Sequence, residues 1–194
     1  MGAGRVITGF SKPYVAKLSE GIGGIYTYNY GMLLARGVNV SITPDTGDDN
    51  NFHADNVQTE TGKNSFTGGE LTLIVDGLFS DAERLIMGLP ASSGGWKTYN
   101  DDQNIPFVGV GFIARYQSNG ATTYVPMVIS KCMFNQINTS AATQEESIEF
   151  QTQELTARIY KIGNSLWKKV HTEVATEAEA EAILRSWFYI LDEE

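Results

Sequence analysis

Residues 36–56, RGVNVSITPDTGDDNNFHADN, hold the densest group of side chains that could bind a metal ion. Carboxylate oxygens and an imidazole nitrogen are common metal ligands, and this stretch offers them at Asp45, Asp48, Asp49, His53 and Asp55. Started at Asp49, the calcium-loop pattern places an alanine where a glycine is required. Started at Asp45, it ends on an asparagine instead of a glutamate. The pattern therefore favours a solvated loop over a metal site.

The sequence shows no pairing of a nucleophile with a nearby base. His53 and His171 lie far apart in the chain, and neither has a catalytic motif around it. Cys132 lies in an expected strand, where cysteine usually behaves as a small buried hydrophobe. Glycine runs at 2–4 and 21–24 lack the third glycine and the strand-to-helix context of a dinucleotide site. We therefore predict no enzymatic activity, no cofactor and no bound metal.

The aromatic residues give little sign of a carbohydrate platform. Tryptophans occur only at Trp96, Trp167 and Trp187, which are scattered along the sequence. Core or interface packing is the more common use of such residues, so we favour it here.

Length and composition indicate a single globular domain over residues 1–194. No window contains the roughly 18 uninterrupted apolar residues of a membrane helix, so we predict no membrane span. The N-terminal stretch has no apolar signal core, and a lone cysteine cannot form an internal disulfide. Both features indicate a protein made in a cytoplasm.

The net charge of -9 is unevenly distributed. Residues 45–102 hold 11 acids and 3 bases, and residues 145–194 hold 11 acids and 5 bases. Tight binding of nucleic acid depends largely on basic contacts to phosphate. This charge distribution argues against a protein that grips DNA.

Alternation of apolar and polar residues, with turn residues between the runs, predicts a chain made mainly of strands. The most regular pair flanks Asn119-Gly120, a dipeptide typical of tight hairpins. Pro126 interrupts the second arm, which suggests a sheet edge or a bulge there. We expect strands at 14–18, 25–28, 38–43, 52–59 (weaker), 71–75, 105–117, 121–134, and a third pair, 148–162 with 165–173, as a hairpin; 61–69 reads as a loop.

Two short helices are predicted by capping boxes, in which side chains satisfy free amides at the helix start. Ser80 with Glu83 opens a helix at about 81–87 that ends at Gly88. Thr176 with Glu179 opens a C-terminal amphipathic helix at about 176–190. Both helices should pack on the strands with their apolar faces.

The succession of four segments resembles the major tail protein family of long-tailed, non-contractile phages and prophages. These segments are ITGFSKPYVAK (7–17), the stretch from Tyr26 to Asn56, LTLIVDGL (71–78) and FVGVGFIARYQSNGATTYVPMVISKCMFN (107–135). Their order and spacing extend the resemblance over nearly the whole chain, from Arg5 to EAEAEAILRSWF near the C-terminus. No single segment is specific to the family.

The resemblance implies an antiparallel β-sandwich or partial barrel of the tail-tube type, with a short flanking helix and the C-terminal helix. It implies a structural subunit of the virion tail, assembled in the bacterial cytoplasm into stacked, usually hexameric rings around a channel for DNA. The expected partners are further copies of the chain and the tape-measure, tail terminator and baseplate proteins, with DNA passing through unbound. The family has no catalytic residues to transfer to this sequence.

Ring assembly would account for long strands whose edges are otherwise an aggregation hazard. We expect the acidic loop that contains Asp45, Asp48, Asp49, His53 and Asp55 to contact a neighbouring ring, because it is polar and poor in apolar anchors. The alternative is a carbohydrate- or receptor-binding β-sandwich module of a virion or cell-surface protein, which would also be rich in strands, glycines and aromatics.

Overall fold

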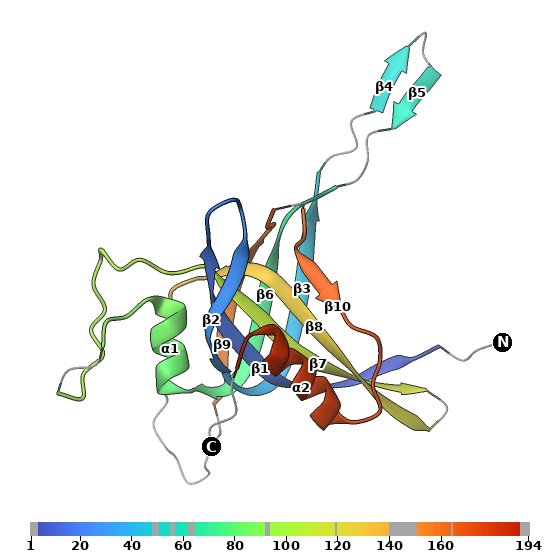
Figure 1. Ribbon diagram of the computed structural model, residues 1–194. Helices are drawn as coiled ribbons and strands as arrows, with labels where there is room; N and C mark the ends of the chain where they lie inside the picture. The colour runs from blue at the N-terminus through green and yellow to red at the C-terminus, as the bar shows by residue number, and fades with distance from the viewer. Residues whose placement is uncertain are drawn as a thin grey trace.

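The computed structural model describes residues 4–47, 51–54, 57–61, 65–91, 94–118, 120–139, 151–163 and 165–190, with the backbone alone for 51–54 and 57–61. Strands predominate, as the alternation predicted (Figure 1). They are β1 (Val6–Glu20), β2 (Tyr26–Leu33), β3 (Ala35–Thr46), β4 (Asn51–Ala54), β5 (Val57–Thr61), β6 (Phe66–Leu78), β7 (Val108–Ser118), β8 (Ala121–Phe134), β9 (Gln153–Tyr160) and β10 (Lys168–Val170). The helices are α1 (Ser80–Met87) and α2 (Glu177–Trp187).

Among the described residues, eight strands form one antiparallel sheet in the order β2-β1-β7-β8-β9-β6-β3, with β10 paired to β8. The sheet curls so that β3, at one end, comes close to β1, next to the other end, and only Leu34 separates β2 from β3 in sequence. The amide of Leu34 donates to the carbonyl oxygen of Pro13 in β1 at 2.8 Å. The result is a partial barrel, closed at this junction.

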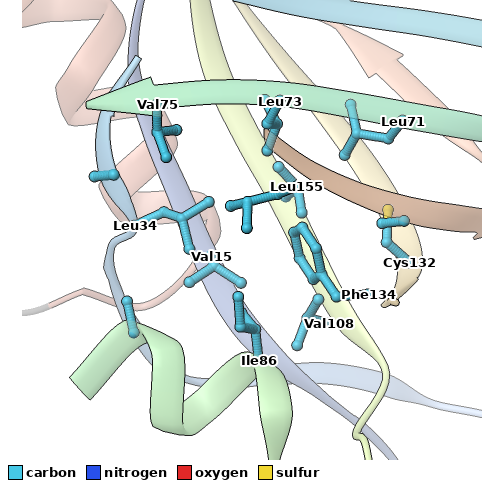
Figure 2. Packing of buried hydrophobic residues seen from close by; sticks show 14 of the residues in the cluster. Val15, Leu34, Leu71, Leu73, Val75, Ile86, Val108, Cys132, Phe134 and Leu155 are labelled. Carbon is cyan, nitrogen blue, oxygen red and sulfur yellow. The ribbon is translucent and has the colours of Figure 1, made fainter. Parts of the chain in front are cut away.

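The inside of the barrel is filled by aliphatic side chains from strands distant in sequence. Figure 2 shows Val15, Leu73, Ile86, Val108 and Phe134 converging from β1, β6, α1, β7 and β8. All five are at most 2% exposed. Full burial of an aliphatic side chain contributes about 1.5–3 kcal/mol, so this cluster is the main source of fold stability.

Helix α2 covers the outer face of only part of the sheet. Its buried residues Ala180 and Leu184, together with Phe188, pack on Ile113 of β7 and Val128 of β8. The outer face of β3, β6 and β9 instead carries hydroxyl and charged side chains, in rows such as Ser41–Thr72–Thr156 and Thr43–Glu70–Arg158. One half of the sheet is thus covered by a helix, while the other half has the composition of a surface in contact with water.

The structure confirms one of the two predicted capping boxes. Thr176 accepts from the amide of Glu179, whose side chain accepts from the amide of Thr176. The box predicted at Ser80 is wrong, because α1 has Phe79 as its N-cap and no side-chain cap bond. Glu83 is engaged elsewhere, by Lys97 and Tyr99. As predicted, α1 ends at Gly88, which has a left-handed backbone with φ of 66°.

The hairpin predicted between 148–162 and 165–173 is also wrong. A tight turn does exist, marked by the bridge between Ile162 and Leu166, but β10 pairs with β8 and not with β9. Strand β8 is long enough to pair with both strands. It pairs with β9 from Lys131 to Phe134 and with β10 from Met127 to Ile129.

Pro126 lies inside β8, opposite Ile113 of β7, so the predicted edge position is wrong. The irregularity appears in the segment on the other side of β8. Regular pairing there stops after Val170 and resumes only at the bridge between Tyr124 and Val174. In between, the amide of His171 donates to the Pro126 carbonyl oxygen at 2.9 Å. A proline has no amide hydrogen to donate, which explains the interrupted ladder.

Candidate functional site

Asp45, the first acid of the candidate loop, lies within a strand. It pairs with Gly68 across the β3–β6 ladder, so both strands extend further than the sequence predicted. The predicted loop at 61–69 is therefore wrong, since β5 runs to Thr61 and β6 begins at Phe66. The Asp45 carboxylate forms an ion pair with Arg158 of β9 at 2.7 Å. Asp45, near the end of β3 and before the segment that leads to β4, is thus paired with a cation of the same chain.

His53 lies in β4, where its backbone is opposite Gln58 of β5. These two strands form a separate two-stranded sheet, so the single weak strand predicted from 52 to 59 is in fact a hairpin. Figure 1 shows this hairpin standing away from the curled sheet, beyond the ends of β3 and β6. Asp48, Asp49 and Asp55 lie outside the described residues. Their predicted contact with a neighbouring ring stays a prediction.

Within the described ranges, no group of three or more His, Cys, Asp or Glu side chains is placed to hold a metal ion. Cys132 is fully buried, and burial raises the pKa of its thiol well above the ordinary value. The exposed His171 has Nδ1 2.9 Å from the carbonyl oxygen of Thr172. No helix in the described part of the chain is long and apolar enough to cross a membrane.

The two end strands of the sheet are the surface that the sequence did not locate. Across the described residues, β2 pairs only with β1, and β3 pairs only with β6. The first half of β1, before Tyr14, pairs with β7 alone. Backbone donors and acceptors along these free edges are available to another strand. Large apolar side chains are exposed on or beside them: Val6, Ile7, Ile22, Ile25, Tyr30 and Val38.

A groove separates two of these edges where the barrel is open. It has a volume of about 400 Å³ and lies between the first half of β1 and β3. Phe10 and Phe112 meet edge to face at its base, with ring centroids 5.5 Å apart. Phe10 also occupies the space next to Gly37, where an added Cβ would meet its ring at 2.1 Å. Phe10 thus lines the groove and also takes up the space beside Gly37.

A polar latch ties α2 to β1 near this opening. Lys12, with a left-handed backbone at φ of 51°, and Tyr14 both donate to the carboxylate of Glu181. Burial alone would raise the pKa of Glu181, but these donated hydrogen bonds outweigh it and hold the pKa below the usual value. Burial, and then the bond to Glu181, raises the pKa of the Tyr14 hydroxyl. The latch therefore holds α2 against β1.

The tryptophans have three different environments. Trp167 stacks on Phe66 with centroids 4.2 Å apart, whereas Trp96 is 77% exposed. Trp187 lines a hollow with Tyr26, Tyr28 and Tyr189, at the meeting of β2 and α2. The predicted core or interface packing therefore holds for Trp167 and for Trp187, each of which packs against a buried cluster. Trp187 is also part of an aromatic group whose members lie far apart in sequence.

Comparison with known proteins adds no relative. No family model matches this chain, and no curated protein matches it either. Support for a function therefore comes from the geometry and from the resemblance of the sequence segments.

Proposed function

We propose that this chain is the repeating subunit of a hollow tail tube of the kind found in long-tailed, non-contractile phages. In this proposal, copies join head to tail into a ring, rings stack into a tube, and DNA passes through the channel. The protein is then a structural component of the virion and needs no catalytic residue. The tape-measure, terminator and baseplate proteins would be its partners in such a tail.

The observation that carries the proposal is the position of the free edges. Strands β2 and β3 stand at the two ends of one curled sheet, and within the described residues each is paired on one side only. Joining the β2 edge of one copy to the β3 edge of the next is a heterologous contact, and repeating it builds a ring or a helix. Ring closure covers both edges in every subunit, which removes an aggregation hazard that a monomer would carry.

The outer face of β3, β6 and β9 also suits a tube wall. It consists mainly of hydroxyl groups such as Thr72 and Thr156, and its cation Arg158 stands in register with Glu70 and pairs with Asp45, an arrangement that favours weak over tight binding of phosphate. The hairpin of β4 and β5 projects away from the sheet and is available for contact with another ring (Figure 1).

Disulfide cross-linking tests the edge contact. Tyr30→Cys places a thiol on β2 and Val38→Cys places one on β3, at side chains that are 74% and 55% exposed. Native Cys132 is fully buried and gives little background. Under mild oxidation, the double variant should form a ladder of covalent oligomers, and each single variant should give at most dimers. Only monomers or dimers from the double variant would contradict head-to-tail joining.

A second candidate function, a carbohydrate-binding module, is favoured by one observation. The hollow lined by Tyr26, Tyr28, Trp187 and Tyr189 has a volume of about 640 Å³, and Ser186 and His171 add polar groups. Aromatic faces with a few polar groups are typical of small-ligand sites of this size. Titration calorimetry with neutral oligosaccharides tests it: heat that disappears in Trp187→Ala would support a glycan site, and no heat at millimolar glycan would exclude one.

A further inference from the structure

The net negative charge of the chain comes from three segments. Residues 48–64, 140–150 and 191–194 together hold ten carboxylates and one lysine. The remainder of the chain holds 13 acids and 13 bases, so it is neutral as a whole. The rest of the chain therefore has no surplus of positive charge to neutralise these acidic segments.

Three lysines at the end of the barrel rest on aromatic rings. Nζ of Lys131 lies 4.1 Å from the ring centre of Phe107, and Nζ of Lys161 lies 5.9 Å from that of Phe66. Lys168 lies 5.9 Å from the Trp167 ring, which stacks on Phe66. Attraction to a ring face holds the stem of a lysine in place without neutralising its charge.

These side chains are linked by contacts that pass around the end of β9. Lys131 of β8 pairs with Tyr160 of β9, whose ring meets Phe107, and Lys161 follows directly. The Phe66–Trp167 stack then connects Lys161 to Lys168 of β10. Arg158, two residues before Tyr160, faces the same side of the strand. We call the four cations Lys131, Arg158, Lys161 and Lys168, with the rings of Phe66, Phe107 and Trp167, the lysine–aromatic strip.

The described basic residues divide into those that form an ion pair with a carboxylate and those that do not. Lys12, Arg36 and Lys97 each pair with a carboxylate of the chain. Within the described part of the chain, the three lysines of the strip make no such pair. Arg158 does, to Asp45, and this contact shows that a carboxylate can bind on the strip. The strip thus presents fixed cations, and three of them lack a described carboxylate partner.

We propose that the lysine–aromatic strip binds an acidic segment of a second copy of this chain. The inference rests on the proposed self-assembly and goes beyond it by naming the receiving surface. Charge complementarity supports a second copy, because every copy carries both the strip and three segments with excess carboxylates. Nucleic acid is the less favoured occupant, because four cations on a chain of net charge -9 provide little of the electrostatic affinity that phosphate binding requires.

Charge reversal on the full-length chain tests the proposal. Lys131→Glu with Lys161→Glu should raise the concentration needed for assembly at least tenfold, measured by light scattering and negative-stain microscopy. Arg115→Glu is the matched control, since Arg115 is an exposed cation near the far end of β7, in register with Tyr124 and outside the strip. It should leave the assembly threshold within twofold. Thermal melting identifies loss of fold, and Lys161→Gln then serves as the milder variant.

The partner segment is tested by rescue. Reversing acids in one segment of the strip variant, by Asp48→Lys with Asp49→Lys, or Glu145→Lys with Glu146→Lys, or Glu193→Lys with Glu194→Lys, should restore assembly in one case. Rescue supports the proposal and identifies the segment. If the wild-type chain assembles but folded strip variants assemble equally well, the strip has no such role. A wild-type chain that never assembles counts against the proposed function instead.

A fluorescent double-stranded oligonucleotide serves as the competing probe. In 150 mM salt, the wild-type chain should show no binding at micromolar protein. Binding that is lost in the strip variant would overturn the proposal in favour of a phosphate site.

Discussion

The ring of Phe188 lies where a side chain on Gly111 would stand, since a Cβ added to Gly111 would meet Cε2 of Phe188 at 2.5 Å. Gly109 is similarly close, at 2.9 Å from the same ring. The two glycines of β7 therefore form a socket, and Phe188, which is fully buried, seats the end of α2 in it. The docking of α2 depends on the absence of two side chains as much as on its own apolar face.

Filling this socket should destabilise the protein. Gly111→Ala forces the Phe188 ring to move, and overpacking of this kind costs about 1–3 kcal/mol. Gly9→Ala is the matched control, because a Cβ there meets Arg115 at an ordinary 3.6 Å. Urea unfolding followed by tryptophan fluorescence measures both. Equal stability of the two variants would mean that α2 is not seated as described.

The two helix starts give a second contrast. Thr176→Ala removes an N-cap bond and should cost about 1 kcal/mol of unfolding free energy. Ser80→Ala removes a hydroxyl that makes no cap bond and should change stability by less than about 0.5 kcal/mol. The same urea experiment tests both variants. A loss of stability at Ser80 as large as that at Thr176 would indicate that Ser80 does cap α1, which would contradict the structure.

The differences between sequence and structure have physical causes. The β7–β8 hairpin was predictable because Asn119-Gly120 is a local signal. Ser80 with Glu83 is an equally clear local pattern, but Lys97 and Tyr99, 14 and 16 residues after Glu83, take its carboxylate. The prediction of a β9–β10 hairpin was wrong for a similar reason, because β10 pairs with a stretch of β8 that β9 leaves unpaired. Long-range competition for a partner cannot be read from spacing.

The candidate site shows the same limit. Its acidic loop was visible as composition, but nothing local revealed that Asp45 would pair with Arg158 over a hundred residues away. Which strands have a free edge depends on the order of the strands in the sheet. The alternation of apolar and polar residues predicts strands but not their order. The aromatic group around Trp187 likewise forms only when β2 and α2 come together.

The latch on α2 should make stability depend on pH. The pKa of Glu181 is lowered in the folded state, so its contribution is present above the unfolded pKa and is lost as pH falls through the folded value. Glu181→Gln should therefore lower Tm at neutral pH, and the difference from wild type should shrink in acid, below about pH 4. Glu154→Gln, at an exposed carboxylate of β9, is the control. A difference that stays constant with pH would contradict the latch.

The free edge of β3 should control association without controlling folding. Val38→Lys adds a charge to an exposed edge position and should prevent pairing with another strand. Thr72→Lys adds the same charge to β6, which pairs with β3 on one side and with β9 on the other, so it leaves the free edge unchanged. Sedimentation velocity at increasing concentration should show association lost in the first variant and kept in the second, with unchanged melting of both monomers. Loss of association in both variants would point to bulk charge as the cause.

Negative-stain electron microscopy of the purified wild-type chain, over a wide range of concentration and salt, tests the central claim most directly. We predict rings or tubes with a visible central channel, which the Val38→Lys variant does not form. Discrete monomers or closed dimers under every condition, with the edges of the sheet still free, would contradict a tube subunit.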